Sequence, residues 1–288
     1  MRAHKRRAAS GFEQAAFLHR RAAEDLAERL EAIPRDFPRA LIYGAPALMA
    51  DAIAARPELA GRIGAITLAD ASAALVPRGA AFAPDAWPFE AESFDLIVSP
   101  LALHWANDLP GALIQARRAL KPDGLFLATL FGGETLMELR LALIEAESEV
   151  LGGASPRIAP FADLQDLAGL LQRAGFALPA ADKDRVTVRY AEPLRLLADL
   201  RAMGETNALA TRATHSLSKR LVARALEAYR ARATDADGRI RATFDLMTLT
   251  GWAPHASQQQ PLKPGSARTR LADALGVQEN SAGEKPND

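Results

Sequence analysis

The chain has 288 residues, of which 49% are hydrophobic, and its 35 Lys and Arg balance its 35 Asp and Glu. This length and composition are typical of one large globular domain with a sizeable core. A net charge of zero argues against a nucleic-acid-binding protein, which usually carries a basic excess. With no cysteine the chain can form neither disulfides nor thiolate metal sites. Its apolar runs fall short of the ~20 residues that span a bilayer.

The first seven residues are basic, but no apolar segment follows them, so they do not match a secretory signal. They could be an organelle transit peptide, or they could be a basic segment that leads into the first helix. Phe12 to Ile33 has helical apolar spacing, and Pro34 ends it. We therefore expect residues 1–33 to form an N-terminal helical element that precedes the main domain.

Two strands are predicted in the first quarter of the domain. Residues 39–44 indicate a strand and a tight turn, followed by a helix at 47–55. Residues 64–70 indicate a second strand that ends on Asp70, and residues 79–82 a weak third one. A carboxylate in the position of Asp70 either accepts the ribose hydroxyls of a nucleoside or simply caps a turn.

The middle of the chain predicts a strand–helix–strand unit. The apolar runs 94–98 and 124–130 are too short for helices and are bounded as buried parallel strands are. Between them, residues 108–120 are amphipathic and end in Lys-Pro-Asp-Gly, where a helix must stop. Such a unit closes right-handed. The pattern predicts an α/β fold with a mostly parallel sheet.

Polar and aromatic residues follow these two strands. Ser99, His104 and Trp105 come after the fourth strand, and Glu134 after the fifth. The carboxyl ends of strands in open α/β sheets bind ligands. His104 could relay a proton and Trp105 could face a cation, or both could be structural. Glu134 could hold a guanidinium or other cationic target, or cap the next helix.

The last third of the chain predicts more helices and strands. The expected helices are 136–150, 161–174, 193–203 and 217–233, and the expected strands are 176–190 and 239–251. The segment 191–235 is expected to form a helical lid over the ligand edge, or an insertion packed on the sheet. Residues 266–288 are polar and are expected to form a largely disordered tail.

Several motifs together resemble a known superfamily. Phe-Asp-Leu-Ile-Val-Ser at 94–99 and Leu-Lys-Pro-Asp-Gly-Leu-Phe-Leu at 120–127 resemble class I S-adenosylmethionine-dependent methyltransferases. The runs 101–113 and 130–140 more narrowly resemble the complex I assembly factor 5 subfamily, a relative of the biotin-synthesis malonyl-carrier-protein methyltransferase. The Gly-Glu-Thr-Asn loop at 204–207 also matches this subfamily. The resemblance implies a Rossmann-like, seven-stranded, mostly parallel sheet with helices on both faces and a lid, over residues 34–265.

The resemblance also implies S-adenosylmethionine as cofactor. The positions that match its binding residues are Tyr43, Gly44, Ala45, Asp70, Ala71, Asp85, Ala86 and Ser99. By this match Asp70 would meet the ribose and Asp85 the adenine amino group, although Asp85 also suits an ordinary turn. Ile42 stands where the family has an acid, and Pro46 and Leu48 where it has glycines. Either the loop still binds cofactor, or the fold is a scaffold whose site has eroded.

The function implied by the resemblance is work on respiratory complex I during its assembly, with one of its subunits as protein substrate. The activity would be methyl transfer or arginine hydroxylation, with His104, Trp105 and Glu134 as catalytic candidates. A non-catalytic assembly chaperone and a malonyl-carrier-protein O-methyltransferase are the alternatives. We expect no metal, nucleic acid or integral membrane segment. The expected location is the cytoplasm of a bacterium, or the mitochondrial matrix of a eukaryote.

Overall fold

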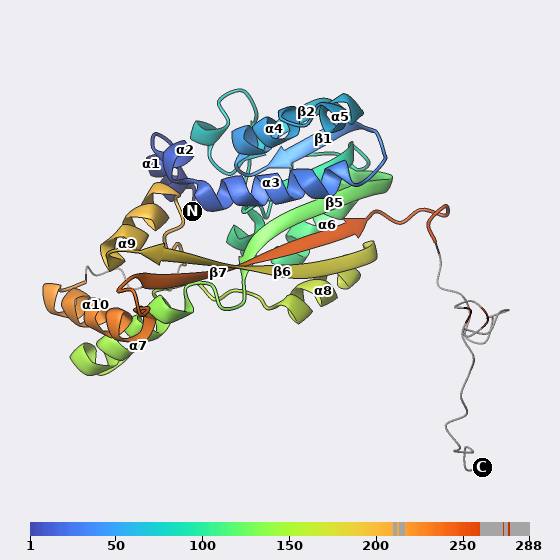
Figure 1. Cartoon of the computed structure of the whole chain (residues 1–288). Helices are drawn as coiled ribbons and strands as arrows, with labels where there is room; N and C mark the ends of the chain where they lie inside the picture. The colour runs from blue at the N-terminus through green and yellow to red at the C-terminus, as the bar shows by residue number, and fades with distance from the viewer. Residues whose placement is uncertain (210–211, 213–216, 260–272, 274–275, 277–288) are drawn as a thin grey trace, which may run out of the picture. The chain divides into compact units, whose positions relative to one another are not determined.

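The computed structural model describes residues 1–209, 212, 217–259, 273 and 276. Contacts divide the chain into two units, Met1–Pro254 and His255–Asp288. The first unit is built on a seven-stranded sheet with helices packed against it (Figure 1). The predicted fold class is therefore confirmed. Most of the expected tail, 266–288, lies outside the described residues.

The sheet has the strand order β3-β2-β1-β4-β5-β7-β6. Its strands are β1 (Phe37–Tyr43), β2 (Ile63–Asp70), β3 (Ala80–Ala81), β4 (Phe94–Pro100), β5 (Leu120–Gly132), β6 (Ala177–Tyr190) and β7 (Ile240–Trp252). The first five are parallel, and β7 runs antiparallel to both β5 and β6. The chain order reverses between β1 and β4, and ligands of open α/β sheets bind beside such a reversal.

Helices connect and flank the strands. They are α1 (Arg2–Ala8), α2 (Phe12–Ala15), α3 (Phe17–Glu31), α4 (Pro46–Ala54), α5 (Pro57–Arg62), α6 (Leu109–Ala119), α7 (Met137–Leu151), α8 (Leu164–Arg173), α9 (Pro193–Ala202) and α10 (Lys219–Ala233). Two 3-10 turns, η1 (Ala73–Leu75) and η2 (Leu103–Trp105), follow β2 and β4. Proline lies at the start of α4, α5, α6 and α9, where its missing N–H costs nothing.

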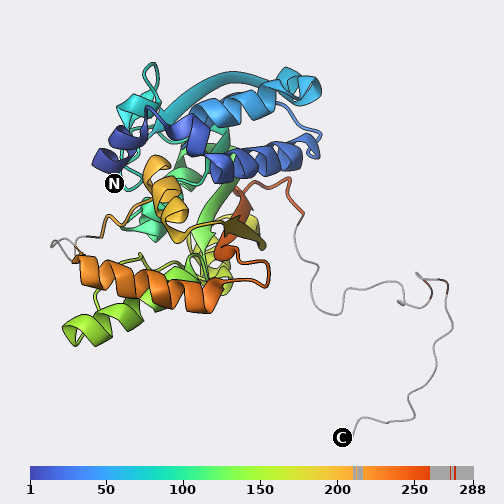
Figure 2. The same ribbon diagram turned by 60° about the vertical axis from the view of Figure 1, so that its left-hand side comes forward.

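Alternating side chains of the central strands build a core on each face of the sheet. Ile97 of β4 packs in the core that contains α6 and α8. Its neighbour Val98 packs in the opposite core, which contains α3, α4 and α5. A third core joins α7, α9 and α10 to the ends of β5 and β7. In Figures 1 and 2, α7 and α10 lie side by side at this end of the sheet.

The N-terminal region differs from the single helix expected over 12–33. The structure has three helices, with a break at Ala16, whose ψ is 38°. The Phe12 ring, before the break, lies edge-on to the His19 ring after it, at 4.9 Å. Helix α5 was also missed, because Arg56-Pro57 reads as a stop although proline favours the first position of a new helix.

Candidate functional site

The turn after β1 contains one glycine in a conformation that lets a backbone approach a ligand closely. Gly44 has φ +93°, and its N–H donates to the carbonyl oxygen of Ala69 on β2 at 2.9 Å. A Cβ at Gly44 would lie 2.3 Å from the Cβ of Ala102, so only glycine fits there. The next residue, Ala45, is also left-handed, with φ 42°. Pro46 then opens α4, and Leu48 is nearly buried beneath it.

Tyr43, at the end of β1, lies in an aromatic cluster. Its ring stacks on Phe82 at 4.7 Å and lies 5.7 Å from Trp87. Its hydroxyl donates to the carbonyl oxygen of Phe82 at 3.3 Å. Burial is the main reason that the pKa of Tyr43 is raised. Tyr43 is therefore a neutral, fully buried side chain near the ends of β1 and β3, and it does not line the cavities described below.

Asp70, at the carboxyl end of β2, is completely buried. One oxygen accepts the N–H of Ser72 at 2.8 Å, and the other lies 3.4 Å from the ammonium of Lys5 on α1. The Lys5 side chain is only 3% exposed. The carboxylate expected to meet a ribose is therefore paired with a lysine of the chain's own first helix. The next residue, Ala71, lines a cavity of about 410 Å³ together with Arg2 and Arg6.

Asp85 and Ser99 have different surroundings. The Asp85 carboxylate accepts the side-chain amide of Asn107 at 2.8 Å and the N–H of Asp108 at 3.0 Å. Asp85 thus holds the turn at residues 84–86 against the start of α6. The next residue, Ala86, is exposed. Ser99 is fully buried in β4, and its hydroxyl has no hydrogen-bond partner within the described part of the chain.

These surroundings test whether the chain fits S-adenosylmethionine. A buried carboxylate at the end of β2 suits a pair of ribose hydroxyls, and Ala71 and Ala45 line cavities of about 410 and 250 Å³. Neither cavity is lined by Asp70 or Asp85, and both lie against the N-terminal helices. Asp70 and Asp85 therefore do not face one of these cavities together, and a nucleoside could reach the Asp70 carboxylate only if Lys5 left it. Pro46 has no backbone N–H and so cannot donate a hydrogen bond to such a ligand.

A second cluster of polar side chains surrounds Glu205, in the loop after α9. Its Oε2 lies 2.9 Å from Nε2 of His104 on η2, and its Oε1 lies 3.4 Å from Nε1 of Trp105. Nε2 of His19 on α3 lies 3.5 Å from Oε1, which is too long for a strong hydrogen bond. The side chains of Glu205, His104 and His19 are at most 5% exposed.

The pKa values of Glu205 and His19 are both lowered, but for different reasons. Burial raises the pKa of Glu205, but His104 and His19 outweigh it, so the pKa lies well below the ordinary value. Burial is also the main reason that the pKa of His19 is lowered, against the opposite effect of Glu205. Glu205 is therefore a buried carboxylate ion at neutral pH, and His19 is neutral.

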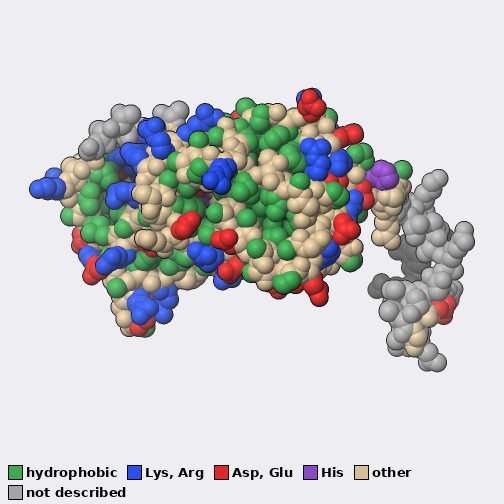
Figure 3. Space-filling model, turned by 90° about the horizontal axis from the view of Figure 1, so that it is seen from above, with side chains coloured by type: hydrophobic (Ala, Val, Ile, Leu, Met, Phe, Trp, Pro, Cys, Tyr) green, Lys and Arg blue, Asp and Glu red, His purple; other side chains and the backbone are tan. Residues whose placement is uncertain are grey.

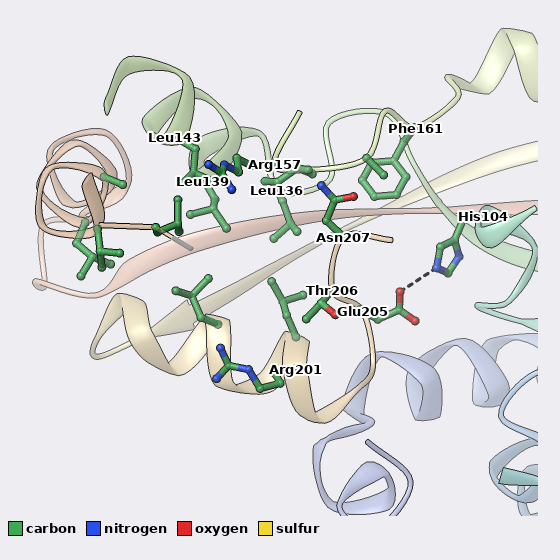
Figure 4. A pocket seen from close by; sticks show the side chains of 18 of the residues that line it. His104, Leu136, Leu139, Leu143, Arg157, Phe161, Arg201, Glu205, Thr206 and Asn207 are labelled. Atoms are coloured by element: carbon green, nitrogen blue, oxygen red, sulfur yellow. Dashed lines mark hydrogen bonds and ion pairs between the residues drawn. The ribbon is translucent and has the colours of Figure 1, made fainter. Parts of the chain in front are cut away.

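Glu205 and His104 lie at one end of a cavity of about 300 Å³. Figure 4 shows the pair at this end and Leu143 of α7 toward the other, with apolar side chains and the polar Arg157, Thr206 and Asn207 between them. The walls come from α7, α9, α10 and the 157–161 loop. The expected lid helices therefore flank a real cavity. Sequence reasoning singled out His104 and Trp105 but missed Glu205, whose only signal was the match of its loop to the subfamily, and His19.

Glu134 lies apart from this cluster. Its carboxylate is half exposed and forms an ion pair with Arg185 of β6, which also binds Asp245 of β7 at 2.7 Å. The Glu134 N–H donates to Asp245 at 3.0 Å. The structure therefore joins Glu134 to a cation of the same chain, while its predicted role in substrate binding stays a prediction.

Charged side chains of both signs are spread over the face seen in Figure 3, in keeping with the net charge of zero. Within the described residues, no three His, Asp or Glu side chains are grouped so that they could hold a metal ion. The helices of the same residues are all too short or too polar to cross a membrane.

The sheet order, the ligand edge and the cavity define a class I methyltransferase fold. The methyltransferase-domain family model matches residues 58–128. The YcgJ protein of Bacillus subtilis has the same fold, with a TM-score of 0.53 and 16% identity over 80% of this chain and 98% of that one. A candidate methyltransferase from Bacillus halodurans C-125 gives a TM-score of 0.51 at 12% identity, over 81% and 99% of the two chains.

Proteins related in sequence define the family more narrowly than the shared fold does. The mitochondrial arginine hydroxylase NDUFAF5 of Homo sapiens is 38% identical over 86% of this chain and 73% of its own length. A malonyl-[acyl-carrier protein] O-methyltransferase of Halorhodospira halophila is 34% identical over 90% and 89% of the two chains. The chain belongs to the class I methyltransferase-fold family that contains these two proteins. It spans only 58% of NDUFAF5 from Danio rerio, at 44% identity over 65% of this chain, and 43% of the Dictyostelium discoideum protein.

Proposed function

We propose that this protein is a methyltransferase-fold enzyme that modifies a protein substrate, a complex I subunit, during assembly of that complex. Its similarity to proteins named as arginine hydroxylases supports the substrate class. The observation that carries the proposal is the cavity that ends on the buried carboxylate of Glu205, because it offers an anionic receptor to a side chain entering from outside.

S-adenosylmethionine, when bound, would supply a sulfonium methyl group, with Asp70, Ala71 and the 43–45 turn as the residues that hold it. Methyl transfer requires a nucleophile aligned with that methyl group. Arginine hydroxylation instead adds one oxygen atom and requires an oxidant, such as dioxygen with an electron donor. Both reactions remain within the proposal.

His104 is the residue best arranged to move a proton. A hydrogen on Nε2 that donates to Glu205 leaves Nδ1 as the acceptor, and Nδ1 is buried without a hydrogen-bond partner among the described residues. A carboxylate that orients an imidazole is a recurrent arrangement in acid–base sites. Trp105 borders the same cavity and offers its ring to a cationic group.

The test is mass spectrometry of complex I subunits from a strain that lacks the gene. Loss of a +16 mass on an arginine-containing peptide would identify hydroxylation, and loss of +14 methylation. Unchanged masses on all subunits, with complex I still poorly assembled, would instead support the chaperone alternative. Calorimetry adds a second criterion, because no heat with millimolar S-adenosylmethionine would also favour a scaffold with an eroded cofactor loop.

A second function is favoured by one observation. The malonyl-carrier-protein methyltransferase relative aligns over 90% of this chain, more than the human arginine hydroxylase does. Its malonyl substrate carries a carboxylate, which the anionic Glu205 would repel, although Arg201 also lines the cavity. Complementation of a biotin auxotroph would support this function, and failure to complement would remove it.

Two expectations from the sequence belong to the proposal. Glu134 is a further candidate for holding the target, and a Glu134→Gln variant with intact target binding and modification would refute that role. The proposed location is the bacterial cytoplasm, or the matrix in a mitochondrial protein, where newly made complex I subunits are accessible. No nucleic acid takes part in the proposal.

A further inference from the structure

The cavity beside α7, α9 and α10 has mainly apolar walls, with Arg157 and Arg201 also among its lining residues, and one end carries the Glu205 carboxylate. Leu139, Leu200 and Leu226 are among its lining residues, while Glu205 stands at the end near His104. A mainly apolar cavity that ends on a carboxylate suits a ligand with an aliphatic stem and a cationic head. Long basic side chains have this construction.

The Glu205 carboxylate keeps acceptor capacity for such a head. An ionised carboxylate has about four lone-pair positions. Among the described residues, only one short hydrogen bond, from His104 at 2.9 Å, uses them, since the contacts of Trp105 and His19 are 3.4 and 3.5 Å long. Oε1 can therefore accept a well-directed hydrogen bond from a ligand.

The partners that stabilise the Glu205 anion are imidazoles, since His104 and His19 hold its pKa below the ordinary value. Burying an ion costs several kcal/mol unless a cation or several hydrogen bonds offset it. His19 is held neutral by its burial, and Lys5, which interacts electrostatically with His19, is committed to Asp70. A guanidinium that reaches Oε1 would bring a permanent positive charge to this carboxylate, which favours a charged head over a neutral one.

We propose that Glu205 binds the guanidinium group of an arginine side chain from the protein substrate, with Trp105 against its flat face. A guanidinium matches a carboxylate through parallel N–H donors and stacks on aromatic rings, whereas a lysine ammonium does neither as well. The aliphatic stem of the arginine lies along the apolar walls. This inference rests on the proposed function, for which it specifies the substrate group and its receptor.

Binding of small probes to the full-length protein tests it directly. N-acetyl-arginine amide carries the guanidinium, and N-acetyl-citrulline amide has nearly the same shape with a neutral urea. We expect calorimetry to show that the arginine probe binds at least about tenfold more tightly than the citrulline probe, because hydrogen bonds to charged groups contribute about 1.5–3 kcal/mol. Equal affinities, or no binding of the arginine probe at about 10 mM, would overturn the proposal.

Glu205→Gln keeps the shape of the side chain and removes its charge. We expect this variant to reduce the preference for arginine over citrulline from tenfold or more to below about threefold. Glu138→Gln is the matched control, since Glu138 is a buried glutamate of α7 that binds Thr243 and does not line the cavity. It should retain the preference. If Glu205→Gln does not fold, Glu205→Asp can replace it, because it withdraws the carboxylate by one methylene. This variant should weaken binding of the arginine probe and leave binding of the citrulline probe unchanged.

The deletion strain tests the proposed function, and the Glu205 variants test the receptor role separately. If complex I subunits lose their modification in the deletion strain but keep it with Glu205→Gln, the function stands and the receptor role is refuted. If the deletion changes no subunit, the function fails, and the arginine probe decides the receptor role separately. A preference for guanidinium that survives both Glu205 substitutions would refute the receptor role in either case.

Discussion

The ammonium of Lys5 lies 3.4 Å from the carboxylate of Asp70, and both side chains are buried. Its neighbour His4 lies 2.6 Å, through Nδ1, from the hydroxyl of Thr206, which follows Glu205. One short helix, α1, therefore contacts both the proposed ribose carboxylate and the loop of the proposed substrate receptor. A ligand that displaces Lys5 from Asp70 would also alter the contact of α1 with that loop.

Lys5→Met is predicted to strengthen S-adenosylmethionine binding about tenfold, because the cofactor no longer competes with an ion pair worth on the order of 1.5 kcal/mol. Without ligand the variant should be less stable than wild type, since Asp70 is left unpaired. Isothermal calorimetry and thermal unfolding with and without cofactor measure the two effects. Arg7→Met is the control, because Arg7 is exposed and its guanidinium donates to the carbonyl oxygen of Ala3 in the first turn of α1. Weaker binding by Lys5→Met would contradict the competition.

The stability of the protein is predicted to fall between pH 7 and pH 5, in part through His19. The folded pKa of His19 is lowered from 6.5, so below that pH the unfolded chain binds a proton that the folded protein does not. The groups that act on it are Glu205, Lys5 and His104. A tenfold difference in proton affinity between the folded and unfolded chain corresponds to about 1.4 kcal/mol of stability.

His19→Gln should therefore flatten the dependence of the urea midpoint on pH over this range. Glu205, whose folded pKa is lowered, adds stability that is complete above about pH 4.5 and is lost only at more acid pH, so it should not mask the effect. An unchanged slope between pH 7 and 5 in the variant would show that His19 is not the titrating group.

Gly44→Ala is predicted to destabilise the fold by about 2–4 kcal/mol. The new methyl group would add strain at φ +93° and would also collide with Ala102. Gly152→Ala is the matched control, because Gly152 has φ +75° but no atom within 4 Å of the added carbon. It should cost only about 1 kcal/mol. Similar urea midpoints for the two variants would mean that the turn after β1 is not closely packed.

Ser99→Ala is predicted to leave the free energy of unfolding within about 1 kcal/mol of wild type. The hydroxyl is buried without a protein partner, so its removal breaks no hydrogen bond within the described structure. If Ser99 binds the cofactor, as its match to the family implies, the same variant should bind S-adenosylmethionine several-fold more weakly. A loss of stability above about 2 kcal/mol would reveal a partner within the protein and argue for a purely structural role.

Local pattern was enough for the strands and for most of the helices, but not for α1, α2 and α5. The apolar runs at 94–98 and 124–130 became the cores of β4 and β5, and Asp108, as the cap of α6, accepts the N–H of Gly111. These features depend on residues close in sequence, whose spacing and hydrogen-bonding groups are visible in a single chain. The seven-stranded, mostly parallel sheet was implied by the family resemblance, and the structure confirms it.

Tertiary structure alone decided which polar groups meet. His104 and Glu205 are 101 residues apart, Lys5 and Asp70 are 65 apart, and His4 and Thr206 are 202 apart. No periodicity links such positions, since their contact depends on how α1, α3 and the loop after α9 pack at one edge of the sheet. For the same reason the sequence could suggest Asp70 as a candidate ribose carboxylate but could not reveal the lysine that pairs with it.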